Sequence, residues 1–389
     1  MHNTTLYLYT TPLICSAIDK NYTIDAKLYD DCDFFEILKL SLEHNITSLI
    51  YEGVRKSGIQ IDDDLDKLFK QRVIFECVKS ESQIAYFKKI SSEFKKHNIP
   101  HIPLKGICMK NLYPKSELRR MGDIDIYVDE KNIEKVEQIM SELQFEFCGR
   151  TDYDYKFKNA NELLIEIHTS IVSEESEFYD YYRNPWRLCK KDEKSVMHTL
   201  NNEEMYIYLF LHFMKHYRGG GIGINHVVDL WIYKNTVPHL DEDYINSKIE
   251  QFGFKTFYDN TLRMIGCLFG NGEEDSVVSD MIDFVMNSGS YGTKEGHQAA
   301  VVIKNVRRIG ARGRLVTIYE KIILPREKME YKYPVLKKRP YLLFFCRCHR
   351  LFRRVFLKRD KELNMRDVIK ANSSQKIDEY KNHLNKVGL

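Results

Sequence analysis

The sequence lacks any long apolar run, and this argues against helices that span a membrane. No stretch approaches the ~18 to 20 apolar residues that a helix needs to cross a bilayer, and the N-terminal stretch MHNTTLYLYTTPLIC has no basic segment of the kind that begins a secretory signal. The nine cysteines are scattered singly, apart from Cys346 and Cys348, and their odd number does not fit a secreted disulfide framework. These absences predict a cytoplasmic protein.

The sequence also lacks an excess of either charge. Its 59 basic and 56 acidic residues give a formal charge of +3, so the whole-chain sum identifies no polyanionic partner. It has no low-complexity tract and no repeat of about 20 to 50 residues. What it does have is a hydrophobic content of 43% over 389 residues, enough for a substantial core and two or three structural units.

Helical patterns flank the middle of the chain. From Asp33 to His97, apolar residues recur at three- and four-residue spacing, which predicts an N-terminal helical region over residues 1–90. The same spacing returns in residues 203–217 and 225–234, on either side of the glycine-rich segment RGGGIG. We expect residues 186–300 to form a helical domain that closes a cleft, and residues 301–389 to form a basic, partly amphipathic region.

Residues 91–185 combine strand and helix patterns. Strands are predicted at HIPL, DIDIYV, FEFCG, YDYKFK and ELLIEIH, and helices at 105–113 and 132–143. The resulting order, β-α-β-α-β-β-β, predicts a small mixed β-sheet. The fold class is therefore α+β, with this core flanked by helical regions.

Two acidic residues in the DIDIYV segment are the first candidate site residues. Because side chains alternate along a strand, Asp123 and Asp125 project from one face and Ile124 from the other. Repulsion between two such carboxylates approaches ~4 kcal/mol at a separation of ~4 Å, and a hard divalent ion such as Mg²⁺ would relieve it. Glu166, in the strand-like run that ends at His168, is the best third carboxylate. The alternative is that the two aspartates are solvated surface charges.

Four short motifs together resemble a known family. They are LKG at 104–106, the arginine pair at 119–120, GDIDIYV at 122–128 and IEIH at 165–168. The segment is similar to the polymerase-β-like nucleotidyltransferase superfamily, and specifically to a family of uncharacterised bacterial nucleotidyltransferases with LKG, R-x-x-x-DIDI and a carboxylate-x-His strand. The resemblance covers about residues 95–235.

The resemblance implies roles for the acidic residues and for the turn after the first strand. Asp123 and Asp125 would bind the nucleotide-associated metal, and Glu166 would be the third metal-binding and catalytic carboxylate. Gly106 would stand where the turn approaches the nucleotide phosphates. The turn of the superfamily is usually Gly-Ser or Gly-Gly, so Lys105 departs from it and would add a positive contact.

Four further residues would contribute to the nucleotide site by the same resemblance. Arg119 would reach a phosphate, with a plain surface charge as its alternative. His168 shares a strand face with Glu166, and His216 and Asp229 would form part of the wall of the site.

The implied function is transfer of a nucleoside monophosphate from an NTP to a hydroxyl or phosphate acceptor, with Mg²⁺ or Mn²⁺ and release of pyrophosphate. The acceptor could be a small molecule, a sugar phosphate or a macromolecule. Two alternatives stay open: a non-catalytic nucleotide-sensing or scaffold protein, and a nucleic-acid-binding protein that uses the basic C-terminal region.

A basic segment near the C-terminus suggests a second interaction. Residues 332–359 contain ten lysines and arginines interleaved with apolar residues, and no carboxylate lies between Glu330 and Asp360. This composition suits an anionic membrane surface, which would place the protein at the inner face of the membrane. An ordinary amphipathic helix and nucleic-acid binding are the alternatives. No structural zinc is expected, because His212 and His216 lack the glutamate of a zinc-binding helix.

Overall fold

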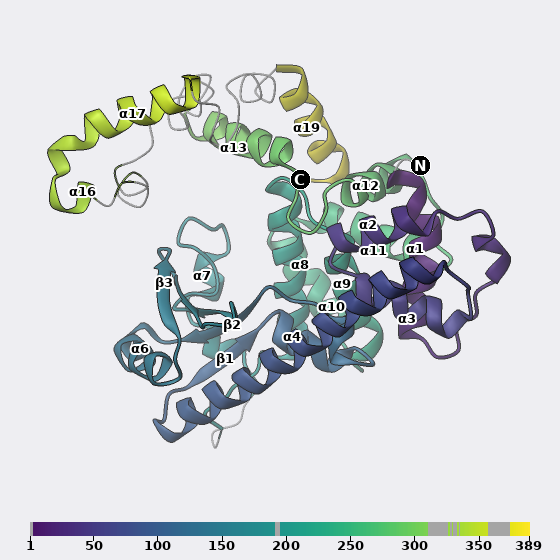
Figure 1. Cartoon of the computed structure of the whole chain (residues 1–389), viewed down its shortest axis with the longest axis horizontal. Coiled ribbons are helices and arrows are strands. Elements are labelled where there is room, and N and C mark those ends of the chain that lie inside the picture. The colour runs from purple at the N-terminus through teal and green to yellow at the C-terminus, as the bar shows by residue number, and fades with distance from the viewer. Residues whose placement is uncertain are drawn as a thin grey trace. The chain divides into compact units, whose positions relative to one another are not determined.

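The computed structural model describes residues 3–190, 195–309, 326, 329, 333, 335–356 and 374–389. They form two units (Figure 1). The first comprises residues 1–214 and 222–290, and the second comprises residues 215–221 and 291–389. Among the described residues, none of the helices combines the length and the apolar character that crossing a bilayer requires.

The first unit begins with four helices, of which the last three lie in the segment from Asp33 to His97 where the apolar spacing predicts helices. They are α1 (Asn3–Ile18), α2 (Phe34–Glu43), α3 (Thr47–Ser57) and α4 (Asp63–Lys96). Helices α1 and α3 approach so closely that a Cβ atom on Gly53 would overlap the backbone of Leu13. Helix α4 begins after Asp62, whose carboxylate accepts hydrogen bonds from the backbone N–H groups of Asp64 and Leu65.

A five-stranded mixed sheet follows, and it confirms the α+β fold class. Its strands are β1 (His101–Leu104), β2 (Asp123–Val128), β3 (Glu146–Arg150), β4 (Asp154–Lys158) and β5 (Leu164–His168). They are arranged in the order β1-β2-β5-β4-β3. The central pair, β2 and β5, is parallel, and the other pairs are antiparallel.

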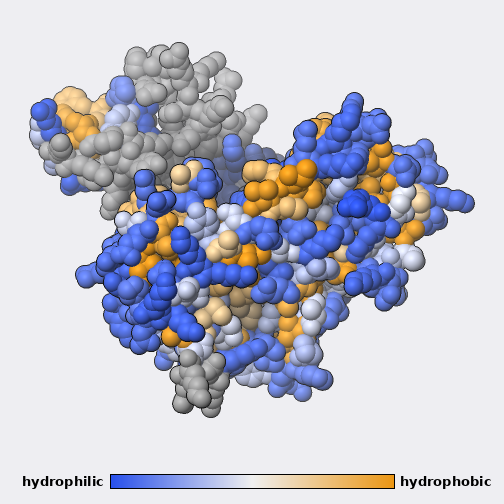
Figure 2. Space-filling view, turned by 60° about the horizontal axis from the view of Figure 1, so that its bottom comes forward, coloured by the Kyte–Doolittle hydropathy of each residue, from blue (hydrophilic) through white to orange (hydrophobic). Residues whose placement is uncertain are grey.

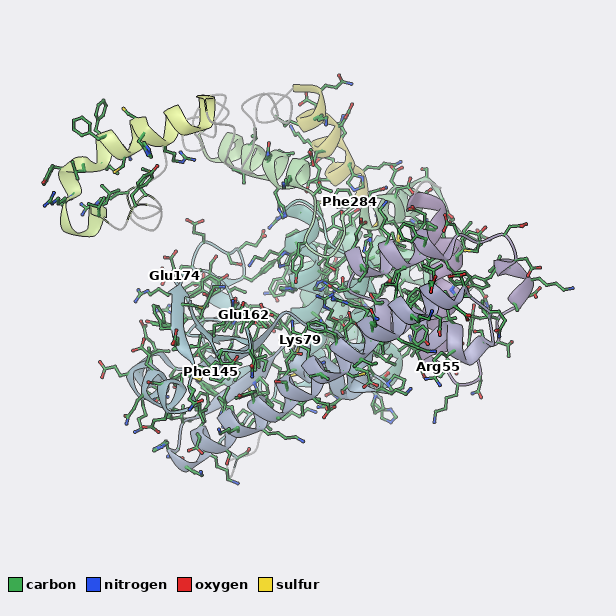
Figure 3. The ribbon with its side chains drawn as sticks, viewed as in Figure 1. Arg55, Lys79, Phe145, Glu162, Glu174 and Phe284 are labelled. Atoms are coloured by element: carbon green, nitrogen blue, oxygen red, sulfur yellow. The ribbon has the colours of Figure 1, made fainter. Side chains whose placement is uncertain are left out.

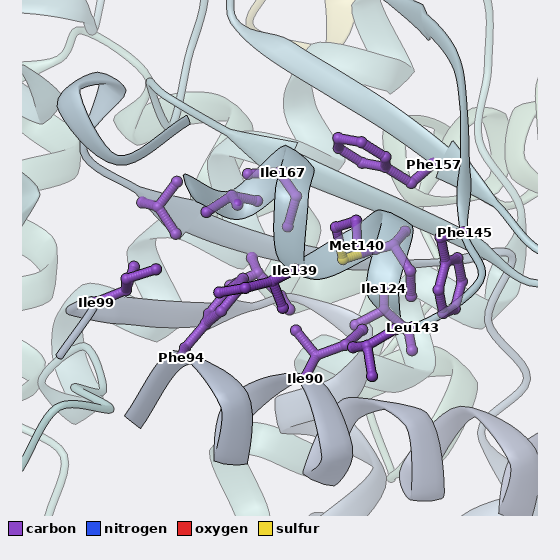
Figure 4. Packing of buried hydrophobic residues seen from close by; sticks show 14 of the residues in the cluster. Ile90, Phe94, Ile99, Ile124, Ile139, Met140, Leu143, Phe145, Phe157 and Ile167 are labelled. Carbon is purple, nitrogen blue, oxygen red and sulfur yellow. The ribbon is translucent and has the colours of Figure 1, made fainter. Parts of the chain in front are cut away.

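One face of the sheet carries the hydrophobic core. Helix α6 (Ile133–Glu142) and the C-terminal part of α4 cover this face, and Figure 4 shows Ile90, Phe94 and Ile139 packed beneath the strands. The strands contribute Ile124 and Ile167, both fully buried. Because alternate residues of a strand face opposite sides of a sheet, the residues next to these isoleucines along each strand lie on the other face.

The helix predicted over 105–113 is shorter than its pattern suggests. Helix α5 spans only Gly106–Met109 and is followed by a 3₁₀ turn, Lys110–Leu112. Two features end it. Pro114 disfavours helical geometry at Tyr113, which is extended, and the buried Lys110 ammonium donates to the backbone carbonyls of Ser116 and Arg119 at 3.0 and 2.8 Å.

The rest of the first unit is helical. It contains α7 (Tyr179–Tyr182), most of α8 (Asn202–Arg218), α9 (Ile224–Thr236), α10 (Glu242–Gln251), α11 (Lys255–Phe269) and α12 (Ser276–Met286). Tyr181 and Tyr244 both donate hydrogen bonds to the buried carboxylate of Glu204 and so join α7, α8 and α10. Hydrophilic residues cover most of the face in Figure 2, where apolar residues form separate patches.

The second unit contains the end of α8 and the described C-terminal helices. These are α13 (Lys294–Ile309), α16 (Val335–Lys338), α17 (Leu343–Phe356) and α19 (Ser374–Val387). Tyr217 and His383 join α8 to α19 through a 2.8 Å hydrogen bond. Much of the predicted basic segment falls in α16 and α17, but residues 332, 334 and 357–359 lie outside the described residues.

Candidate active site

The parallel pairing of β2 and β5 brings the predicted carboxylates together. Asp125 lies directly opposite Glu166 in the register, and Tyr127 lies opposite His168. Ile124 and Ile126 point into the core, so Asp123 and Asp125 lie on the opposite, polar face. The apolar alternation of β2 therefore sets the direction of both aspartates.

Asp125 is the most tightly held carboxylate of the site. It is 3% exposed, and its Oδ1 accepts hydrogen bonds from Lys105 Nζ at 2.9 Å and from His168 Nε2 at 2.7 Å. Burial alone would raise the pKa of Asp125, but the Lys105 ammonium and the His168 hydrogen bond outweigh it and lower the pKa. Asp125 is therefore ionised at neutral pH.

Lys105 reaches Asp125 from a strained turn. It lies between β1 and α5 with φ 46° and ψ −119°, a conformation that glycine adopts readily and other residues avoid. Such a conformation costs on the order of 1–3 kcal/mol and persists only where surrounding contacts enforce it. Here the ion pair with Asp125 is such a contact, and the neighbouring carboxylates raise the pKa of Lys105 although burial opposes this.

Glu166 pairs with a lysine that no sequence motif marks as part of the site. Lys156 lies opposite Glu166 in the β4–β5 register and forms a short ion pair with it. Asp154 lies opposite His168 on the same face, is 5% exposed, and also was not predicted. Strand alternation in YDYKFK puts Asp154 and Lys156 on one face, but only the register between strands shows that this is the face of the site.

Asp123 is the third predicted carboxylate and, like Glu166, is partly buried. No hydrogen bond or ion pair of its side chain is found in the described parts of the chain. Burial and the charges of Asp125 and Glu166 raise the pKa of Asp123, so these two carboxylates lie within electrostatic range of it. Burial lowers the pKa of Lys79 on α4, labelled in Figure 3, and the Asp123 charge opposes this change. Lys79 therefore adds a cation to this side of the site.

The donor atoms of the polar face fit a hard divalent cation. Ligand atoms of Asp125, Glu166 and His168 all lie within 4.8 Å of one another, and all three residues are buried. This set contains two of the three predicted metal ligands, with His168 in the place of Asp123. In addition, His168 Nδ1 and Asp154 Oδ1 are buried without a hydrogen-bond partner among the described residues. The carboxylate oxygens of this set suit Mg²⁺ or Mn²⁺, whereas an imidazole nitrogen is a more usual ligand of zinc or iron.

Two predicted nucleotide-binding residues instead bind each other. Arg119 forms a bidentate ion pair with Asp229 on α9, with distances of 3.1 Å from Nε to Oδ1 and 2.6 Å from Nη2 to Oδ2. Tyr113 donates a third hydrogen bond to the same carboxylate at 2.7 Å. Both charged groups are buried, so in this structure they join the segment before β2 to the helical part of the unit.

The structure shows close packing at Gly106 and places His216 in the second unit. A Cβ atom on Gly106 would lie 3.0 Å from Met121 Sδ and 3.1 Å from Met121 Cβ, so close packing explains the glycine there. His216 lies near the C-terminal end of α8, in the second unit. Its place in the wall of the site stays a prediction.

Aromatic residues add to the polar face. Tyr153 lies with its ring centroid 6.1 Å from that of His168. Tyr208 on α8 is buried, and burial together with the Asp125 charge raises its pKa while Lys105 opposes the rise. These two tyrosines come from segments predicted as strand and helix, but nothing in the sequence indicated that they face the carboxylates.

Comparisons with known proteins place this arrangement in context. The solution structure of the antibiotic-resistance factor ANT(2'')-Ia matches with 14% sequence identity over 47% of this chain and 94% of that one, at a TM-score of 0.34. A search of the curated proteins finds no match. The model of a family described as uncharacterised nucleotidyltransferase matches residues 30–270, which include helices α2 to α4, the whole sheet and helices α7 to α11. The chain belongs to this nucleotidyltransferase family.

Proposed function

We propose that this protein transfers a nucleoside monophosphate from an NTP to an acceptor hydroxyl, or to a phosphate, with a divalent cation and release of pyrophosphate. The family supports nucleotidyl transfer as the reaction class. The observation that supports the finer proposal is the convergence of Asp125, Glu166 and His168 within 4.8 Å on one buried polar face, with Asp123 beside them.

Each acidic residue has an assigned task. Asp123 and Asp125 would hold Mg²⁺, and Mn²⁺ is the alternative ion. When bound, the ion supplies positive charge that neutralises the triphosphate. His168 orients Asp125 through the hydrogen bond from Nε2, and Lys156 fixes Glu166. We assign Glu166 as the base that takes the proton of the acceptor hydroxyl.

The reaction balances without a further reactant. The acceptor oxygen forms a bond to the α-phosphorus, and the bond from that phosphorus to the bridging oxygen of the β-phosphate breaks. Pyrophosphate leaves with the electron pair of that bond, and the hydroxyl proton passes to Glu166. Catalysis is then mostly a matter of position and electrostatics.

The direct test is incubation of the purified protein with each α-labelled NTP, Mg²⁺ or Mn²⁺, and a cell extract as the source of acceptors. We expect a labelled product and released pyrophosphate. Asp123→Asn and Asp125→Asn should each abolish labelling while circular dichroism stays native. Retained labelling in either variant would refute the assignment.

A matched control variant shows whether the loss of labelling is specific to the site, and a second outcome would favour another function. Asp64→Asn changes an aspartate that is exposed on α4 and that pairs with Lys67 within the described part of the chain, so labelling should persist. NTP binding without pyrophosphate release, with any extract, would favour the nucleotide-sensing or scaffold role instead.

We also propose that the basic C-terminal segment docks on an anionic membrane surface. Tyr341, Phe344 and Phe345 are 71%, 70% and 67% exposed, whereas Cys346 on α17 is buried in a small cluster with Leu336. The described part of this segment thus presents aromatic side chains to solvent on a helix rich in arginine, a composition suited to an acidic lipid interface.

Flotation with vesicles tests the docking proposal. The full chain should float with phosphatidylserine-containing vesicles at low salt and not with neutral ones, and a variant with Phe344→Ser and Phe345→Ser should float less. Phe35→Ser, at an exposed position on α2, is the control and should leave flotation unchanged. No association with acidic vesicles at low salt would overturn the proposal.

A further inference from the structure

The inference concerns Lys105 and rests on the function proposed above. A lysine stands in the turn between β1 and α5 with backbone angles that favour glycine, although Gly106 is its immediate neighbour. The chain therefore keeps a lysine side chain at this position against its backbone preference. A contact specific to the ammonium group must give it an advantage there.

That contact is with the carboxylate proposed to bind the metal. Lys105 Nζ lies 2.9 Å from Asp125 Oδ1, and the same oxygen accepts the hydrogen bond from His168 Nε2. A carboxylate oxygen offers two lone-pair positions, and at Oδ1 both are in use. A divalent cation must therefore displace one donor from Oδ1, or bind through Oδ2 on the same carboxylate and so come close to the Lys105 ammonium.

Charge balance identifies the donor that leaves. Asp123, Asp125 and Glu166 place three carboxylates in one small region. Among the described residues, Lys105 pairs with Asp125 and Lys156 pairs with Glu166. An ammonium and a divalent cation close to the same oxygen repel each other. Lys105 has a flexible side chain that is 21% exposed, so it has room to move, whereas His168 is 4% exposed on a strand.

We propose that the Lys105 ammonium neutralises Asp125 in the free enzyme. It moves to the triphosphate when a divalent cation and NTP bind together. Lysine is a common phosphate ligand as a point charge. Binding of the cation then depends on the nucleotide. The cation alone binds Asp125 against the repulsion of the Lys105 ammonium, whereas with NTP present the ammonium gains a new anionic partner.

The test measures Mn²⁺ binding without turnover, by electron paramagnetic resonance on the full-length protein. In the absence of nucleotide, Lys105→Met should bind Mn²⁺ at least about tenfold more tightly than the wild type, a change that corresponds to about 1.4 kcal/mol. With a non-hydrolysable NTP analogue present, this advantage should disappear or reverse. Lys115→Met is the matched control, because Lys115 forms an ion pair of the same 2.9 Å length with Glu52 away from the site.

A second variant guards against a folding defect. Lys105→Gly removes the ammonium and places glycine where the backbone favours it, so it should fold and show the same tighter Mn²⁺ binding. Equal or weaker binding of Mn²⁺ alone by both variants would overturn the proposal. Asp125→Asn separates the two hypotheses. If it leaves Mn²⁺ binding unchanged, the metal site itself is misplaced and the proposed function fails, whereas if it abolishes binding, only the role of Lys105 is in question.

Discussion

Arg119 and Asp229 form a buried bidentate ion pair between residues 110 positions apart in the chain. Each group is desolvated, and each is satisfied by the other, with Tyr113 completing the set. The pair ties the segment that leads into β2 to helix α9. The pair thereby fixes the segment that leads into the polar face, and nucleotide contact by either residue stays a prediction.

Breaking this pair should destabilise the fold. Asp229→Asn keeps the shape of the side chain but leaves the Arg119 guanidinium buried without a counter-charge, so we expect a loss of about 3 kcal/mol in the free energy of unfolding. Urea denaturation followed by circular dichroism measures it. The control is Lys67→Met, which removes an exposed ion pair with Asp64 and should change stability little. A loss below about 1 kcal/mol in Asp229→Asn would contradict the role we give to the pair.

Gly106→Ala should destabilise the protein through overpacking. The new methyl group would lie about 3 Å from Met121, and forcing atoms into a packed site costs about 1–3 kcal/mol. Met121→Ala keeps Cβ but removes Sδ, the nearer of the two close atoms, so the double variant should be more stable than the sum of the two single changes predicts. Strict additivity in urea unfolding would show that Met121 is not the obstacle.

The stability of the protein should fall as the pH drops from about 6.5 to about 4, partly because of His44. Its Nδ1 accepts the backbone N–H of Ile224 at 3.2 Å, and its Nε2 lies 3.1 Å from the carbonyl oxygen of Met286, so the ring needs its neutral form. Burial lowers the pKa of His44 from 6.5 to about 4. Between these values the unfolded chain binds the extra proton and the folded protein does not, which removes up to about 3 kcal/mol of stability.

Unfolding free energies at pH 7 and pH 4 test this effect. His44→Gln should be less stable than the wild type at pH 7 but lose less stability on acidification. His97→Gln, at an exposed position at the end of α4, should keep the wild-type slope. An unchanged slope in His44→Gln would rule out His44 as a source of the acid sensitivity.

Glu166 and Lys156 should differ in their effect on turnover. If Glu166 takes the acceptor proton, Glu166→Gln should lower kcat by about 10²–10⁴-fold. Lys156→Met leaves the carboxylate in place and removes only its partner, so a smaller loss of about 10–100-fold is expected. Single-turnover rates with a labelled NTP would compare them, and the reverse order of severity would argue against Glu166 as the base.

The sequence predicts the fold wherever short-range patterns decide it. The alternation of Ile124 and Ile126 with Asp123 and Asp125 was sufficient to predict the strand and its polar face, because burial of one face selects the direction of every second side chain. The α+β class follows from the order of such patterns. The helix predicted over 105–113 ends early, because a proline and a buried lysine override its apolar spacing.

The partners within the site depend on contacts between distant residues. The pairing of Lys156 with Glu166 depends on the register of β4 against β5, and the pairing of Arg119 with Asp229 joins a loop to a helix. Neither is encoded in a local period. The family resemblance assigned Arg119 and Asp229 to the nucleotide site, and it could not show that the two residues pair with each other.

The alignment of β2 with β5 has a consequence for how this enzyme can vary. A deletion of one residue within either strand would turn the side chains beyond it to the opposite face of the sheet. Isoleucine would then lie on the polar face, and aspartate would be buried in the hydrophobic core. Amino-acid exchanges on the core side can be tolerated one at a time, but changes in strand length cannot. We expect lineages of this chain to accept insertions in the turns and almost none between Asp123 and Val128.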